Sequence, residues 1–503
     1  MKRLLIIPLL ATAANAAPVE FSTHIAPIIF RNCAVCHRVG EAAPFTLTSY
    51  DDVKKRAKLI AKVTHDRVMP PWHADKSDFA FLDDRRLTPQ QIDLIQQWVA
   101  QGTPEGDRAK QPALPKFPQG WQLGKPDMIV KMTHAYSVPA EGRDIYRNFI
   151  VPLNLNEDIY VKAVEFRPSS PSVVHHSLFF WDTTGAARRS ANASGITRFT
   201  PMQRENKGTG QLGGWALGAT VRLLPEDLAF LVPKGADLIL ATHFHPSGKA
   251  EEETSTIGLY LTKEPPKRAF TGIQLPPAFG ALAGVDIPAG EKEFTVTDSF
   301  VLTSDAEAFG ISGHAHYLGK KLSMTALFPD GSKKNLVSIN DWDFAWQEQY
   351  TFDKKIPLPK GTRLDARVTW DNSATNPHNP TNPPKRIRWG PQSEDEMGSL
   401  TLLVTAPDKS NIEEINRAQV QHVRDAGSAA IARLLQDRNG GGTLVSVFFK
   451  NNDKNGNGKI EREEAPRWLV ASFDQHDTNK DGALDEKEIQ AAQAKLFQGL
   501  RVP

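Results

Sequence analysis

The chain has 503 residues, of which 40% are hydrophobic and 23% are charged, and its 60 basic and 58 acidic side chains give a formal net charge of +2. This balance gives no indication of a nucleic-acid partner. The composition is ordinary for a soluble protein with buried cores, and at roughly 100–200 residues per domain the length predicts about three or four domains.

The first 17 residues have the pattern of a secretory signal peptide. Two basic residues precede an apolar run over 4–10, and a small-residue cleavage site follows at 14–16. The run is too short for a transmembrane helix, which needs about 20 residues; the alternative is a short membrane anchor. Because no later stretch suggests a membrane span, we expect an exported protein, either periplasmic or secreted.

The sequence Cys-Ala-Val-Cys-His at residues 33–37 is the attachment pattern of covalent haem c. Cys33 and Cys36 are the only cysteines of the chain. Their thiols would attach one haem, and His37 would ligate its iron. The alternatives are a disulfide or a chance match.

The flanks of this motif predict a small all-α domain over 18–107. An amphipathic helix is expected to run into the motif, and a closing helix is expected at 87–102. Both resemble the terminal helices of small monohaem cytochromes c, so the domain is interpreted as a cytochrome c domain. A linker rich in Pro and Lys is expected at 108–124.

The sixth iron ligand should lie between these helices. Met69 is the first candidate, because a thioether raises the iron potential and favours electron transfer over oxygen binding. His65 and His73 are the alternatives.

From about residue 125 to 408, short apolar runs alternate with Gly, Pro, Asn and Asp turns, which is typical of β-sandwiches. The length suffices for two sandwiches, which we place at 125–290 and 291–408. Residues i and i+2 of a strand share one face, so a His-x-His strand presents two imidazoles together. Adjacent histidines need a bulge or a strand end to share a metal. The region contains three histidine pairs: His175 and His176, His243 and His245, and His314 and His316.

Six histidines in three pairs predict metal binding, and imidazole suits zinc, copper, iron and nickel. No H-E-x-x-H motif or carboxylate cluster accompanies the pairs, which argues against zinc proteases and non-haem iron. A blue-copper centre requires a cysteine thiolate. Because both cysteines are assigned to haem, no blue-copper centre is expected. Zinc on the same ligands remains an alternative to copper.

The order of the histidine pairs along the chain resembles that of the copper type II, ascorbate-dependent monooxygenases, which include peptidylglycine α-hydroxylating and dopamine β-monooxygenases. The resemblance covers about residues 125–408 and implies two jelly-roll-like sandwiches with one copper each. The methionine ligand of the family lies in a Ser/Asp-Glu-Met segment, and "SEDEMGSL" supplies Met397 at that place here. Met324 is the alternative methionine. The resemblance implies one copper on His175, His176 and His243, with His245 as a further candidate, and an oxygen-activating copper on His314, His316 and Met397.

This sequence departs from that family in two respects. The family enzymes carry several disulfides and this region has none, and a polar, Pro-rich insertion precedes Met397. No substrate-binding residue is therefore carried over.

Two tandem twelve-residue loops near the end of the chain fit the EF-hand pattern. They predict an EF-hand pair at 443–503 after a helical linker at 409–442, with Ile460 and Leu484 paired across the loops. The first loop has fewer carboxylates and should bind calcium more weakly. The expected ligands of up to two calcium ions are Asp453, Asn455, Asn457, Lys459 (backbone carbonyl) and Glu464, and Asp477, Asn479, Asp481, Ala483 (backbone carbonyl) and Glu488.

Together these parts predict an exported copper-dependent monooxygenase that hydroxylates a C–H bond of a small molecule or peptide with dioxygen. Electrons would come from ascorbate or a redox protein and pass through the haem, and covalent fusion raises the effective concentration of this donor. The alternative is a non-catalytic copper-binding or electron-transfer protein built on the same scaffold.

Overall fold

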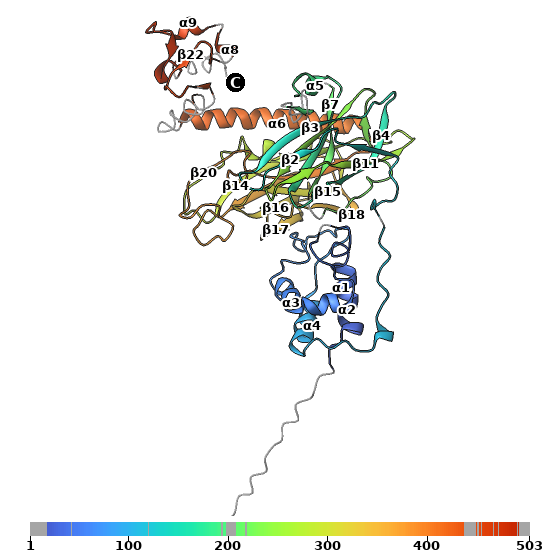
Figure 1. Ribbon diagram of the computed structural model, residues 1–503. Helices are drawn as coiled ribbons and strands as arrows, with labels where there is room; N and C mark the ends of the chain where they lie inside the picture. Colours follow the sequence, from blue (N-terminus) through green and yellow to red (C-terminus); the bar gives the residue numbers. More distant parts are fainter. Residues whose placement is uncertain are drawn as a thin grey trace, which may run out of the picture.

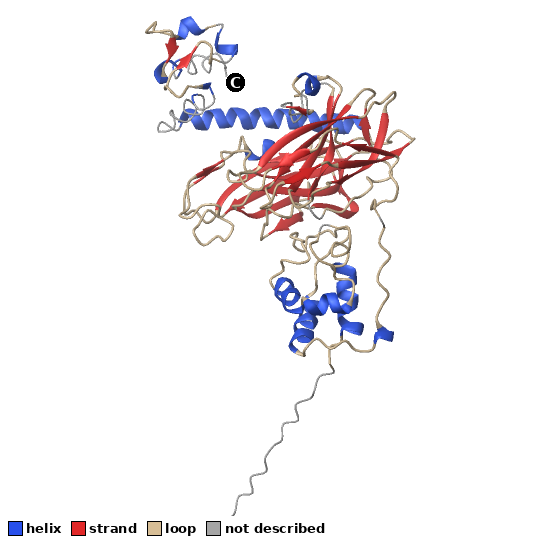
Figure 2. Ribbon diagram, in the orientation of Figure 1, coloured by secondary structure: helices blue, strands red, loops and turns tan. Residues whose placement is uncertain are grey.

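The computed structural model consists of a large body of strands with smaller helical parts on two sides of it (Figures 1 and 2). The helical module that precedes the strands is blue in Figure 1, and the long helix α6 runs along the body toward the carboxyl-terminal module. The predicted signal peptide at 1–17 lies outside the described residues. The structure describes residues 18–41, 43–118, 120–192, 195–197, 208–216, 219–436, 449, 452–453, 455–465, 467–470, 472–489 and 491.

The amino-terminal module consists of short helices around one apolar core, which includes Phe21, Ile95 and Trp98. The predicted closing helix is confirmed: it begins at a capping box in which Thr88 and Gln91 bind each other's backbone N–H groups. Among the described residues, no helix is long and apolar enough to cross a membrane. The helices are η1 (Phe21–Ile25), α1 (Ala26–Asn32), α2 (Tyr50–Lys55), α3 (Ala57–His65), α4 (Pro89–Ala100) and η2 (Arg108–Lys110).

The first sandwich packs a five-stranded sheet against a four-stranded sheet, and the strands of each sheet pair antiparallel. Phe179 and Leu240 of one sheet meet Val161 and Leu259 of the other in a single core. In sheet order the strands are β6 (Ile196–Thr197), β3 (Ile145–Pro152), β9 (Asp237–Phe244), β5 (Val174–Asp182) and β7 (Thr209–Ala216), and β1 (Met128–Lys131), β11 (Thr256–Thr262), β4 (Ile159–Arg167) and β8 (Phe230–Val232).

The second sandwich packs two four-stranded antiparallel sheets. Its core joins Ile311 and Leu402 of one sheet to Leu322 and Val368 of the other. The strands are β12 (Phe270–Leu275), β21 (Gly398–Thr405), β15 (Ala306–Ala315) and β18 (Gln349–Leu358), and β14 (Phe294–Val301), β19 (Arg363–Trp370), β16 (Gly319–Leu327) and β17 (Lys333–Ile339).

Strand pairing moves the boundary between the two sandwiches. β12 pairs along its length with β21, so the second sandwich begins at Phe270, whereas the sequence placed its start at residue 291. Alternating apolar residues have the same pattern in either sandwich, and only the strand pairing assigns β12 to one of them.

Shorter elements complete the body of strands. They are the strand pairs β2 (Tyr136–Val138) with β10 (Glu251–Glu253) and β13 (Asp286–Ile287) with β20 (Ile387–Arg388), and the short helices α5 (Ala186–Arg189) and η3 (Pro277–Gly280).

One segment of the amino-terminal module belongs to the core of the second sandwich. Trp72, Ala74 and Phe81 are buried in that core, and the Leu82 amide donates to the carbonyl of Thr351 at 2.9 Å. We call residues 72–86 the docking segment. The boundary predicted at residue 107 therefore does not separate two independent packing units.

Helix α6 (Lys409–Gln436) is more than the predicted linker, because it packs on the second sandwich. Ile412 and Ile415 are buried in the core of that sandwich. Farther along the helix, His422 Nε2 lies 2.9 Å from a carboxylate oxygen of Asp298 on β14.

The carboxyl-terminal module has a small core of its own that includes Phe473 and Ile489. Its two loops are joined by the short strand pair β22 and β23, in which Ile460 lies opposite Leu484. That cross-loop pairing confirms the sequence prediction. The elements are β22 (Ile460–Glu461), α8 (Arg467–Val470), α9 (Phe473–His476) and β23 (Ala483–Leu484).

Candidate metal centre

The Cys33–His37 motif follows the end of helix α1. Cys33 and Cys36 are not joined in a disulfide. His37 Nδ1 lies 3.0 Å from the carbonyl oxygen of Phe45 and donates to it, which leaves Nε2 free to bind a metal. Burial lowers the pKa of His37, and a neutral imidazole is the form that ligates iron.

The three candidates for the sixth ligand lie in different surroundings. His65 is exposed and paired with Asp66, and His73 is half-buried within the docking segment. Met69 is half-buried just before that segment, and its amide donates to the carbonyl of Val63. These surroundings argue against the exposed His65 but do not separate Met69 from His73, whose buried Nε2 has no hydrogen-bond partner among the described residues.

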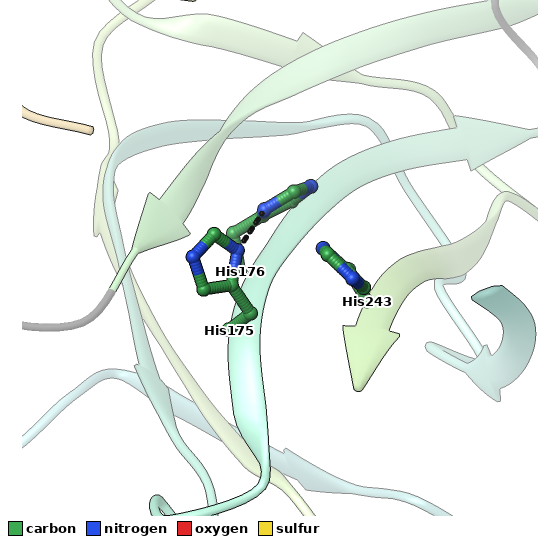
Figure 3. Close-up of side chains that lie close together, drawn as sticks. All are labelled: His175, His176 and His243. Atoms are coloured by element: carbon green, nitrogen blue, oxygen red, sulfur yellow. Dashed lines mark hydrogen bonds between the residues drawn. The ribbon is translucent and has the colours of Figure 1, made fainter. Parts of the chain in front are cut away.

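His175, His176 and His243 form one cluster at the end of two adjacent strands of the first sandwich (Figure 3). One ligand atom of each lies within 4.8 Å of the others. The Nδ1 atoms of His175 and His176 are 3.0 Å apart. Three imidazoles this close can converge on a single cation.

A β-bulge brings the adjacent histidines together. The register of β5 against β9 shifts between Val174 and His176, and His176 then lies directly opposite His243. In a regular strand His175 would point to the other face. The bulge that the sequence required for these two residues to share a metal is therefore present.

His314 and His316 lie at the end of β15, with ring centroids 5.2 Å apart. Their Nδ1 atoms are both held by hydrogen bonds: His314 Nδ1 lies 2.7 Å from Gln347 Oε1, and His316 Nδ1 lies 3.1 Å from the Asp395 carbonyl oxygen. Each contact fixes the ring and leaves Nε2 available, which is the usual arrangement of metal-ligating histidines.

The two histidine sets form one continuous cluster. The rings of His176 and His314 are 6.5 Å apart between centroids. Phe344 lies between the sets, stacked on His175 at 4.4 Å and edge-on to His316 at 5.5 Å. The two sandwiches thus meet at their histidine-bearing strand ends.

Burial keeps four of the clustered imidazoles neutral. It lowers the pKa of His175 and of His316 to about 3 and that of His314 to about 4, and it holds the pKa of His176 well below the usual value. The neighbouring histidines add to the effect. Neutral imidazole is the form that binds transition metals.

Met397 stands next to the His-x-His strand, and Met324 does not. Gly398 pairs with Ala315, the residue between His314 and His316, so Met397 lies one residue beyond that pair. Met324 is completely buried in the core on β16, in the other sheet of the sandwich. Of the two methionines, Met397 is the one beside the His-x-His turn.

Glu396 is a positioning residue that the sequence interpretation missed. Its fully buried carboxyl group accepts from the amides of His316 at 3.1 Å and Leu318 at 2.6 Å and from Trp370 Nε1 at 2.8 Å. Burial raises its pKa to about 8. These hydrogen bonds therefore connect the residue before Met397 to the turn at residues 316–318. The sequence feature that could have identified Glu396 is its position directly before Met397.

Replacing Glu396 with alanine is expected to lower the free energy of unfolding by about 3 kcal/mol, because three buried donors lose their acceptor. Glu396→Gln, which keeps one acceptor oxygen, should lose less. Urea unfolding followed by tryptophan fluorescence measures both variants, and an alanine variant as stable as the native chain would contradict the assigned role.

His245 does not join the cluster. Its side chain is 59% exposed, and its Nδ1 lies 2.7 Å from Asp144 Oδ1. The other Asp144 oxygen lies 3.0 Å from His243 Nε2, but neither ring nitrogen of His243 has a hydrogen-bond partner of good geometry among the described residues. Asp144, which no sequence motif marks, lies in the place that a carboxylate takes behind a metal-bound imidazole.

A cavity of about 280 Å³ adjoins this cluster. It lies between the two sandwiches and carries the Arg143–Glu394 ion pair. Tyr317, which follows His316 directly, contributes to its wall, and so does Pro380 of the insertion before Met397. The cavity therefore lies beside Asp144 and Tyr317, which neighbour the clustered histidines, and charged and apolar groups share its wall.

The candidate calcium loops fold as the sequence predicted. In the first, Asp453 accepts from the amides of Gly456 and Gly458. In the second, Asp477 accepts from Gly482, and Glu488 folds back over the loop to accept from Asn479. In both loops the first acidic residue is aimed at the loop centre, as an EF-hand requires.

Asp477→Ala is expected to weaken calcium binding at the second loop by at least about 10-fold, since it removes a carboxylate ligand. Asp453→Ala should leave the tighter of the two sites intact, because the first loop has fewer carboxylates. Calorimetric titration of the full chain with calcium compares the two variants; equal effects would contradict this order of affinity.

Comparisons with known proteins bear mainly on the carboxyl-terminal module. Residues 469–491 match the EF-hand family model, which suggests calcium binding. No match was found among curated proteins. The chain has low similarity to solved structures, including PNGF-II (11% identity, 56% of this chain and 65% of that chain, TM-score 0.23). Another is a peptide-N4-(N-acetyl-β-D-glucosaminyl)asparagine amidase (12%, 56% and 96%, 0.24). A third is the major capsid protein P2 of bacteriophage PM2 (7%, 50% and 99%, 0.19). TM-scores this low do not establish a shared fold with any of these proteins.

Proposed function

We propose that this chain is an exported copper-dependent monooxygenase that receives electrons through a covalent haem c. The observation that carries the proposal is the convergence of five histidines from two β-sandwiches, with a methionine next to them and a cavity nearby. The reaction is R–H + O2 + two electrons + two protons → R–OH + H2O.

The donor set suits copper. Burial favours the neutral form of His175, His176, His314 and His316, and Met397 offers a thioether, which favours Cu(I), the state that must meet dioxygen. The triad of His175, His176 and His243 would hold one copper, and His314, His316 and Met397 would hold the other. Bound copper supplies the one-electron chemistry through which dioxygen is reduced.

The Cys33–His37 motif suits haem c. Two thiols outside a disulfide can form the thioether links, and His37 presents Nε2 because Nδ1 is bound to Phe45. With Met69 as a further ligand beside His37, such a group would store one electron at a raised potential. Helix α4 and the short helices around it form the apolar shell of this module.

The remaining residues of the centre position the ligands and exclude water. Gln347 and the Asp395 carbonyl fix His314 and His316, and Asp144 lies beside His243. Phe344 covers the gap between the two histidine sets. The cavity beside Tyr317 is the candidate substrate site, and Arg143, Gln392 and Glu394 in its wall offer hydrogen bonds to a small or peptide-like substrate.

Isotope labelling tests the proposal. The copper-loaded, haem-containing chain is incubated with ascorbate, ¹⁸O2 and a broad panel of small molecules and peptides. Mass spectrometry should find a product with one ¹⁸O atom, and substrate should stimulate oxygen uptake. Bound copper without any labelled product across the panel would favour the alternative of a non-catalytic copper-binding or electron-transfer protein. Zinc in place of copper, with no copper EPR signal after loading, would favour a zinc site.

A further inference from the structure

The loop between β17 and β18, residues 340–348, lies between the amino-terminal module and the histidine cluster. On one side Gln347 holds His314 through the 2.7 Å contact to Nδ1, and Phe344 stacks on His175. On the other side Glu348 forms an ion pair with Arg85 of the docking segment. Both histidine sets and the amino-terminal module are therefore in contact with one short loop.

The docking segment is fixed to this region by backbone hydrogen bonds. The Asp75 amide donates to the carbonyl of Ser338 at 2.7 Å, and the Asp353 amide donates to the carbonyl of Ala80 at 2.9 Å. Trp72 packs edge-on against Tyr350 with ring centroids 5.1 Å apart. The contact is continuous with the core of the second sandwich, so it is a permanent part of the fold.

The Arg85–Glu348 ion pair lies where this contact reaches the loop, and its two side chains are only 13% and 12% exposed. Pro71, Trp72 and His73, which follow Met69 in the chain, line one small hollow together with Trp346, Gln347 and Glu348. The segment that carries the candidate iron ligand Met69 is therefore beside Gln347, the residue that contacts His314.

We propose that residues 346–348 are the electron route from the Cys33–His37 motif to the histidine cluster, and that electrons enter the cluster at His314. This inference rests on the proposed function. With haem and copper bound, these residues would carry one electron from the haem iron to a copper ion, so that the iron is oxidised and the copper reduced by one electron each, with no bond or proton transferred. The docking segment keeps the route short, and the Gln347–His314 hydrogen bond completes it. The triad at His175, His176 and His243 is then reduced across the short gap between His314 and His176.

Anaerobic rapid mixing tests the route. The oxidised holoprotein receives less than one equivalent of reductant; haem absorbance follows reoxidation of the haem, and freeze-quench EPR follows the loss of the Cu(II) signal. Gln347→Leu should slow internal transfer about 10-fold. Gln347→Glu, which keeps an acceptor for His314, should restore the rate. The matched control is Gln349→Leu, an exposed neighbour that should transfer at the native rate.

A second variant tests the docking contact away from the histidines. Arg85→Met combined with Glu348→Met should slow transfer and should also increase hydrogen exchange at the amides of Asp75 and Leu82, which is measurable without either metal. Native transfer rates in both Gln347→Leu and the double variant would overturn the route alone. Absence of the haem or of the Cu(II) signal in the native chain would overturn the proposed function, and the route with it.

Discussion

A chain in which both Cys33 and Cys36 are replaced by alanine is expected to contain no covalent haem and to lose nearly all turnover with a redox-protein donor. The two thioether links hold the group, and His37 alone cannot retain it through denaturation. Haem staining after denaturing electrophoresis and oxygen uptake measure the two effects.

The control for this variant is Val35→Ala, which changes the exposed residue between the two cysteines and should keep the haem. Copper content should be native in both variants, since the histidines lie on other modules. A cysteine-free variant that turns over at the full rate with the same donor would contradict the proposed role of the haem.

Replacing His176 with alanine is expected to remove the copper of the first sandwich, with an affinity loss of at least about 100-fold. His176 lies opposite His243, and its Nδ1 is 3.0 Å from Nδ1 of His175. Loss of its side chain therefore leaves the other two imidazoles without a third ligand. Copper analysis after dialysis should fall by about half.

The matched control is His134→Ala, which removes an exposed histidine outside the cluster. It should leave the copper content unchanged. Equal copper in His176→Ala and the native chain would contradict the assignment of His176, and an equal loss in both variants would show that the loss is not specific to the cluster.

The strand-rich architecture could be predicted from the sequence because turns and apolar alternation recur regularly, and the cross-loop pair of Ile460 and Leu484 because the EF-hand spacing fixes it. The need for a bulge at His175 also followed from strand geometry alone. These predictions depend only on neighbours along the chain.

What the sequence could not give depends on contacts between distant segments. β12 looks like a strand of either sandwich until its pairing with β21 is known. The docking segment has no periodic pattern, and its apolar residues find their partners more than 200 positions away. Gln347 and Glu396 bind the histidines of the cluster through hydrogen bonds, Asp144 lies beside His243 and binds His245, and none of the three has a motif of its own.

X-ray absorption at the copper edge on the copper-loaded, reduced chain tests the central claim most directly. The account predicts nitrogen scattering from imidazoles together with a sulfur shell from Met397, and it predicts that Met397→Ile loses the sulfur shell while the imidazole nitrogens remain. Met324→Ile, the matched change at the buried core methionine, should keep the sulfur. An all-nitrogen copper in the native chain, or a sulfur shell that persists in Met397→Ile, would contradict it.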